Sequence, residues 1–315
     1  MKRMFTVLLT LSLCAAVLCA PAYAEEPAAP SANLGPVMVW GTITHWTDGS
    51  LLLENSGEGA PYQEIVLHLG EAPVVDAVTG QPLETEKLKD GDTVYAWIGG
   101  AVTLSLPPQA SALLVVGNIP ADYAVPQYYE ITASSIAQEQ AVLTVAGGVK
   151  PVTVPASAEL TPYLTKNVVS LGDLVPGTRI LVWSDGKGAV TRVLVFAYAY
   201  SGYFTCEEDG TVRVNGEALA VKARITDSGE TLLPVRAVAE KLGLFVFWEK
   251  TSGANVCLPG PDGSLIFAVQ PGSGKAEVNK VGNWVELSGS SSLEQGVTYL
   301  SAVDMANLLN LYWAK

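Results

Sequence analysis

The chain has 315 residues and a formal net charge of −13, because 31 acidic side chains outnumber 18 lysines and arginines. Lys and Arg supply most of the affinity of proteins for phosphate backbones and anionic lipids, so this balance argues against nucleic-acid and membrane-surface partners. Hydrophobic residues make up 49% of the chain, and its length suggests two or three domains that can each bury a core.

The first 24 residues have the pattern of a secretory signal peptide. Lys2 and Arg3 form a charged start, an apolar run follows, and Ala22-Tyr23-Ala24 fits a small-x-small cleavage site. Residues 25–35 are rich in Pro and Ala and are predicted to be a disordered tether. No later apolar run is long enough for a membrane helix. We therefore expect a secreted, extracellular protein that is not inserted in the membrane after cleavage.

From residue 36 to residue 200 the chain has a β pattern. Short runs of β-branched, leucine and aromatic residues alternate with Gly, Pro, Asp and Asn. Residues 91–97 align with residues 177–183 at an offset of 86 (177 − 91), and each copy is followed by a glycine-containing turn and another apolar strand. This repeat predicts two tandem OB-like β-barrel modules, at residues 36–122 and 123–203.

Aromatic residues beside predicted strand ends are the weak binding candidates of these modules. Trp46 and Tyr129 are the two that we select, since OB-type barrels often stack sugars or extended chains on aromatic side chains. Half-buried aromatics that cap the barrel cores are the structural alternative. The other aromatics of this group are Trp40, Tyr128, Tyr198, Tyr200 and Tyr203.

The sequence singles out no catalytic or metal-binding set. His45 and His68 are the two imidazoles, and no G-x-S-x-G elbow accompanies them. Acid–glycine pairs such as Asp48-Gly49 fit hairpin turns and lack the ligand spacing of a calcium loop. We expect no enzyme activity, no metal and no cofactor. A glycosidase-type carboxylate pair stays open, because such a pair has no sequence signature.

Gly229 to Leu258 has the clearest local pattern in the chain. Pro234 occupies the first position of a predicted three-turn helix. Apolar residues follow at i, i+3, i+4 and i+7 on one face, and Gly243 is placed to end the helix. Two strands joined by a turn, at residues 245–248 and 254–258, are predicted next.

This run, with the V-x-V-N-G segment at residues 212–216, resembles the copper amine oxidase N-terminal-like domain, or stalk domain, of secreted proteins from Gram-positive bacteria. The resemblance covers about residues 204–315 and implies a stalk that lies away from the oxidase copper. Such a copper site needs three imidazoles, and both histidines lie outside the region, so no copper is implied. The residues that match the family's marker are Gly229, Thr231, Pro234, Arg236, Ala239, Leu242, Gly243 and Trp248.

The same region contains an internal sequence repeat. Residues 296–310 repeat residues 229–243 at an offset of 67 (296 − 229). Ser301 replaces the proline and, with Asp304, makes a capping-box-like helix start. Val303 stands where the first copy has Arg236, for which we expect a solvated position or a local ion pair. Two strand–helix repeats predict an α+β domain.

The four cysteines lie in two regions of the sequence. Cys14 and Cys19 fall in the signal segment, and lipid attachment is disfavoured there because a leucine precedes each. Cys206 and Cys257 remain after processing, and outside the cytoplasm a disulfide between them is the expectation. Two reduced, buried cysteines are the alternative, and metal binding is disfavoured without a nearby histidine.

The sequence therefore predicts a mainly β, secreted protein with a C-terminal α+β domain. We expect a non-catalytic binding or scaffolding role at the cell envelope, with cell-wall polysaccharide, peptidoglycan or another envelope protein as partner. One alternative is a carbohydrate- or peptide-binding accessory module of an envelope enzyme. The other is an envelope hydrolase with an unrecognised carboxylate pair.

Overall fold

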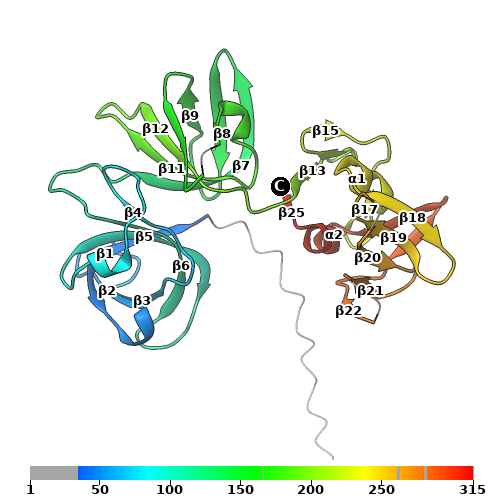
Figure 1. The fold of residues 1–315 in the computed structure, drawn as a ribbon, viewed down its shortest axis with the longest axis horizontal. Helices are drawn as coiled ribbons and strands as arrows, with labels where there is room; N and C mark the ends of the chain where they lie inside the picture. The colour runs from blue at the N-terminus through cyan, green and yellow to red at the C-terminus, as the bar shows by residue number, and fades with distance from the viewer. Residues whose placement is uncertain (1–34, 166, 261–262, 280–281, 315) are drawn as a thin grey trace, which may run out of the picture. The chain divides into compact units, whose positions relative to one another are not determined.

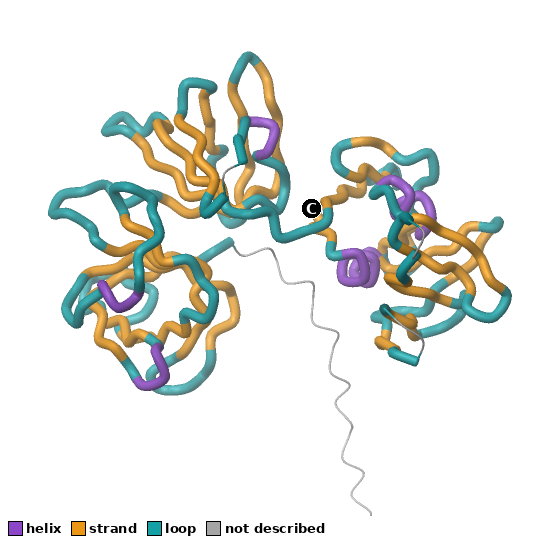
Figure 2. The backbone as a smooth tube through the Cα atoms, viewed as in Figure 1, coloured by secondary structure: helices purple, strands orange, loops and turns teal. Residues whose placement is uncertain are grey.

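The computed structural model describes residues 35–165, 167–260, 263–279 and 282–314. Strands dominate these residues, and the sheets curve into barrel-like layers (Figures 1 and 2). The predicted signal peptide at 1–24, and all of the predicted tether except residue 35, lie outside the described residues. Within the described part, no helix is long and apolar enough to cross a membrane.

Six strands form the first sheet. Their bounds are β1 (Val37–His45), β2 (Leu51–Glu54), β3 (Glu64–His68), β4 (Val74–Asp76), β5 (Thr93–Val102) and β6 (Gln109–Gly117). The order is β3-β2-β1-β5-β6-β4, and a parallel pairing of β3 with β6 joins five of the strands into a closed ring. Short 3-10 turns lie at Thr47–Gly49 and Thr85–Lys87. Side chains alternate across each strand, so every second residue points into the barrel core.

β1 pairs with a different strand at each of its ends. It pairs with β5 through residues 37–42 and with β2 through residues 42–45. Gly41 lies next to Thr42, where the partner of β1 changes from β5 to β2. A Cβ atom at position 41 would lie 2.2 Å from the carbonyl oxygen of Glu54. A residue without a side chain is therefore required for this close approach.

The second sheet has the same strand order as the first. Its strands are β7 (Gln127–Ala137), β8 (Gln140–Val145), β9 (Val152–Pro155), β10 (Glu159–Pro162), β11 (Arg179–Ser184) and β12 (Val190–Val195). The order is β10-β12-β11-β7-β8-β9, and β10 runs parallel to β12 as β4 does to β6. Among the described strands β9 and β12 share no ladder, so this sheet stays open where the first one closes. Pro151 precedes β9 and Pro155 is its last residue, and neither residue has a backbone N–H that could donate to another strand.

The described residues between 202 and 313 form three smaller sheets and two helices. The bounds are β13 (Gly202–Cys206), β14 (Val212–Val214), β15 (Glu217–Ala218), β16 (Arg224–Ile225), β17 (Thr231–Pro234), α1 (Val235–Lys241), β18 (Phe245–Glu249), β19 (Gly253–Cys257), β20 (Leu265–Val269), β21 (Lys275–Val278), β22 (Trp284–Glu286), β23 (Ser292–Glu294), β24 (Val297–Ser301), α2 (Ala302–Leu309) and β25 (Leu311–Trp313). The sheet orders are β15-β14-β13-β25, β16-β17-β24-β23 and β18-β19-β20-β21-β22.

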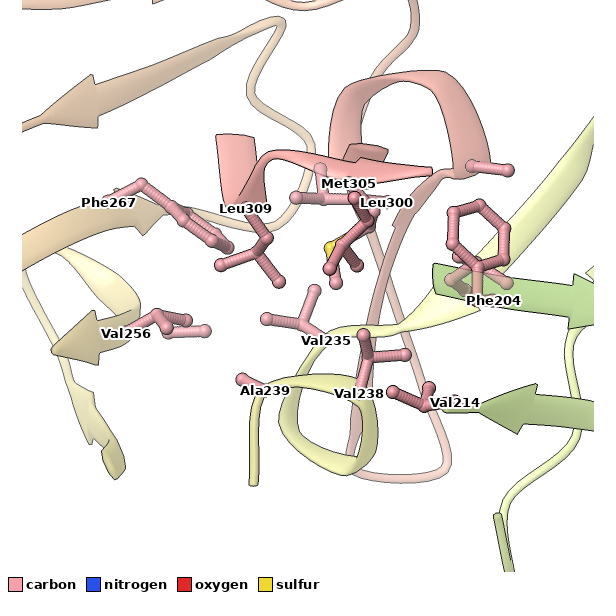
Figure 3. Close-up of a cluster of buried hydrophobic side chains, with 14 of the residues drawn as sticks. Phe204, Val214, Val235, Val238, Ala239, Val256, Phe267, Leu300, Met305 and Leu309 are labelled. Atoms are coloured by element: carbon pink, nitrogen blue, oxygen red, sulfur yellow. The ribbon is translucent and has the colours of Figure 1, made fainter. Parts of the chain in front are cut away.

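Two strand–helix units stand at the centre of this domain. β17 leads into α1 and β24 leads into α2, and the two strands pair antiparallel with Leu233 opposite Leu300. The side chains of Val235, Val238 and Met305 lie between the helices in the buried core (Figure 3). Each helix is short, so its stability comes mainly from this apolar packing.

α1 is shorter than the sequence predicts. It has 7 residues, two turns instead of three, and Pro234 is its N-cap residue, with ψ of 110°, instead of its first helical residue. The reason is tertiary, because Pro234 still belongs to β17 and is paired with Tyr299. Gly243 has a φ of +79° just after the helix, as the predicted left-handed end requires.

Candidate functional site

The two aromatic residues selected from the sequence belong to different parts of the β region. Trp46 follows β1 and is 45% exposed. Tyr129 lies on β7, half-buried against the core of the second sheet, and this burial raises the pKa of its phenol. The structure does not bring these two side chains into one site.

One buried cluster joins the first two sheets, and its buried aromatic residues are Trp97, Tyr128, Trp183 and Phe196. The ring of Trp97 lies 5.9 Å from that of Tyr128, which lies 5.8 Å from Phe196. Trp183 donates from Nε1 to the carbonyl oxygen of Ala77 at 2.7 Å. Trp97 and Trp183, which align in the sequence at the offset of 86, are both buried here. These aromatics therefore support packing between the sheets and offer no exposed face to a ligand.

The histidines have ordinary surface partners. The Nδ1 atom of His45 lies 2.7 Å from the carboxylate of Asp90, and Nε2 of His68 lies 2.8 Å from the side-chain oxygen of Gln109. Hydrogen bonds from the backbone and the ring of His45 lower the pKa of Asp90. Among the described residues no group of three or more His, Cys, Asp or Glu side chains could hold a metal ion.

A groove of about 600 Å³ lies beside α1 in the C-terminal domain. Ligand pockets in proteins typically have roughly 300–1,000 Å³ and apolar walls with a few polar groups. α1 forms one side, and β18 and β23, each the end strand of its sheet, contribute to the others. The lining residues include Val221, Pro234, Arg236, Ala237, Glu240, Val246, Phe247, Trp248, Leu293, Val297 and Thr298.

β18 presents a large aromatic side chain to this groove. Successive residues of a strand point to opposite faces, so Val246 and Trp248 share one face. Val246 is buried in the core, while Trp248 is 49% exposed and lines the groove. Leu293 of β23 also lines the groove and is about half exposed. Exposed apolar side chains gathered round a concave surface are typical of interaction sites.

Arg236 supplies a fixed polar group in this groove. Its Nη1 atom donates to the carbonyl oxygen of Val246 at 2.7 Å and to Oε1 of Glu240 at 3.1 Å. The ion pair with Glu240 is the local contact that helical spacing predicts. The bond to Val246 joins α1 to β18, and the sequence did not predict it.

The comparisons with known proteins assign this domain. Residues 213–312 match the family model of the copper amine oxidase N-terminal domain. The match confirms the resemblance seen in the sequence and includes both helices, Arg236 and Trp248. It covers the C-terminal third of the chain, so the assignment applies to this part alone. No curated protein matches the chain.

Cys206 and Cys257 are free thiols in the structure, and of the two only Cys257 lies within the matched residues 213–312. Cys206 lies half-buried on β13 and Cys257 lies buried on β19, in two different sheets. Burial raises the pKa of each thiol. The disulfide expected from the sequence stays a prediction, and a thiol assay under non-reducing conditions decides it.

Two serines surround a buried carboxylate in the same domain. Asp304 accepts from the backbone N–H of Ser288 at 2.9 Å, and its Oδ2 accepts from the hydroxyls of Ser288 at 2.9 Å and Ser301 at 2.8 Å. Ser301 caps α2 as predicted, because its Oγ accepts from the backbone N–H of Asp304. No imidazole takes part in this network, which connects the loop before β23 to the start of α2.

Proposed function

We propose that this protein is a secreted, non-catalytic binding or scaffolding protein of the bacterial cell envelope, and that its ligand binds in the groove beside α1. The exposed Trp248 on the groove wall is the observation that carries this proposal. Large aromatics at concave surfaces are where binding energy concentrates. The family match supports an accessory role, since the matched model describes an N-terminal domain.

The two β modules are proposed to be copies of one OB-type unit. Their identical strand orders support this, as does the parallel pairing of β4 with β6 and of β10 with β12. Five strands ordered β1-β2-β3-β6-β5 in a closed ring fit a small barrel of this type. In this proposal the aromatic cluster holds the two units together, and they act as a scaffold for the C-terminal domain.

A binding role fits the titratable groups of the groove better than hydrolysis. Arg236 and Glu240 bind each other across one turn of α1. A glycosidase-type mechanism needs two carboxyl groups that face each other across a cleft. Glu240 is the one carboxyl group on the described groove wall.

A sedimentation assay with purified cell wall tests this function. The chain from residue 25 to residue 315 is mixed with the wall over a series of salt concentrations. Saturable binding that is lost in Trp248→Ala is the expected result. Trp284→Ala is the matched control, because Trp284 is 56% exposed on β22, at the far end of the sheet that begins with β18, and does not line the groove. Wild-type-like binding by Trp248→Ala would show that the ligand does not bind in the groove.

An accessory module of an envelope enzyme is the second candidate. The family match favours it, because the matched domain type is described as part of an oxidase. Its partner would be another envelope protein. Cross-linking in the secreting cells, followed by mass spectrometry, would then connect groove residues to one enzyme, and loss of that cross-link in Trp248→Ala would support this candidate.

A further inference from the structure

We propose that the groove beside α1 binds a neutral glycan, with a sugar ring on Trp248 and sugar hydroxyls at Arg236 and Glu240. This inference rests on the proposed binding function and adds the chemical class of the ligand. Three features of the groove support it, namely its aromatic wall, its paired charges and its occupied strand edge.

The aromatic wall suits the C–H face of a sugar. Trp248 leaves about half of its side chain exposed on a strand that the buried Val246 anchors in the core. An amphipathic ring held in this way offers a broad apolar surface that can pack against a ligand ring. Leu293 and Pro234 add further apolar lining to the groove.

The charged groups of the groove match a neutral, hydroxyl-rich ligand. The guanidinium carries five N–H donors, and its two hydrogen bonds within the described residues both leave from Nη1. Glu240 contributes acceptor oxygens beside it, so a sugar hydroxyl can accept from one side chain and donate to the other. A polyanion would instead meet the Glu240 carboxylate and a chain with net charge −13.

The edge of β18 argues against an added peptide strand. β18 is an end strand, and such an edge can bind an extended peptide through main-chain hydrogen bonds. Here, however, the Arg236 guanidinium already donates a hydrogen bond to the carbonyl oxygen of Val246. A peptide laid along β18 would compete with that guanidinium, whereas a sugar ring on Trp248 would not.

Titration calorimetry with the chain from residue 25 to residue 315 tests the ligand class. The ligands are neutral oligosaccharides of N-acetylglucosamine, glucose and mannose, a poly(glycerol phosphate), and a peptide of alternating valine and threonine. We expect binding of a neutral oligosaccharide that changes less than twofold between low and high salt. Trp248→Ala should weaken it at least tenfold, Trp248→Phe should retain part of it, and Trp284→Ala should leave it unchanged.

The outcomes separate this inference from the proposed function. Trp248-dependent binding to cell wall without binding to any neutral oligosaccharide would overturn the glycan and leave the groove as a binding site. Preferential binding of the poly(glycerol phosphate) or the peptide would also overturn the glycan. The absence of Trp248-dependent binding in both assays would overturn both proposals. Circular dichroism melting of Trp248→Ala and Trp248→Phe establishes that each variant is folded.

Discussion

The guanidinium of Arg236 donates to the carbonyl oxygen of Val246, ten residues further along the chain, at 2.7 Å. This bond fixes the start of β18 beside α1 and so helps to set the width of the groove in which Trp248 lies. The same Nη1 atom binds Glu240, which holds the guanidinium in place. Arg236 therefore contributes to the shape of the site as well as to its charge.

Replacing Arg236 should cost more stability than replacing its ionic partner. Arg236→Gln removes the charged group that donates to the carbonyl oxygen of Val246. The free energy of unfolding should fall by about 1.5–3 kcal/mol, as for other hydrogen bonds to charged groups. Glu240→Gln removes only an ion pair that is half exposed on both sides, which is worth about 0–1 kcal/mol. Urea denaturation of both variants checks this order, and equal losses would contradict the role given to the carbonyl bond.

Trp183 should connect the two β sheets through its indole N–H. Trp183→Phe keeps most of the ring but leaves the buried carbonyl of Ala77 without this donor, which should cost about 1–3 kcal/mol. The guanidinium of Arg192, 3.7 Å from the centre of the indole ring, should lose part of its contact as well. Thermal unfolding checks the variant against Trp46→Phe, whose ring is exposed. A change as small as that of the control would show that the contact is dispensable.

Alkaline pH should weaken the aromatic cluster through Tyr128. Burial raises the pKa of this phenol to about 12, from an ordinary value near 10. Between these values the unfolded chain loses the proton and the folded chain keeps it. The free energy of unfolding should therefore fall as pH rises above 10, by about 1.4 kcal/mol per pH unit for this group. Urea denaturation from pH 9 to pH 11 checks the slope, which should become shallower in Tyr128→Phe. An unchanged slope in that variant would assign the effect to other tyrosines.

Asp304 should be one of the most sensitive positions of the C-terminal domain. Asp304→Asn replaces a buried, charged carboxylate that accepts hydrogen bonds from Ser288 and Ser301. The free energy of unfolding should fall by on the order of 2–3 kcal/mol. Val303→Ala, at an exposed position of the same helix, is the control and should change stability by less than about 0.5 kcal/mol. Chemical denaturation gives both values. A loss in Asp304→Asn as small as in the control would show that the network adds little to stability.

The sequence by itself determined the local features of this protein. Gly243 after α1, Ser301 before α2 and the alternating runs of the β region could be predicted, because turns, caps and strand periodicity depend on residues close together in the chain. The family of the C-terminal domain could also be recognised, because its marker lies within Gly229 to Trp248.

Only the tertiary structure decided which side chains are available to a ligand. Nothing in the local pattern distinguishes Trp183, buried against Ala77, from Trp248, half exposed beside Arg236. The shortened start of α1 has the same origin, since Pro234 stays in β17 through its pairing with Tyr299. Burial and groove shape depend on segments far apart in the chain, such as β18 and β23, and the fold brings these segments together. The bond from Arg236 to Val246 spans only ten residues, but it forms because α1 packs against β18.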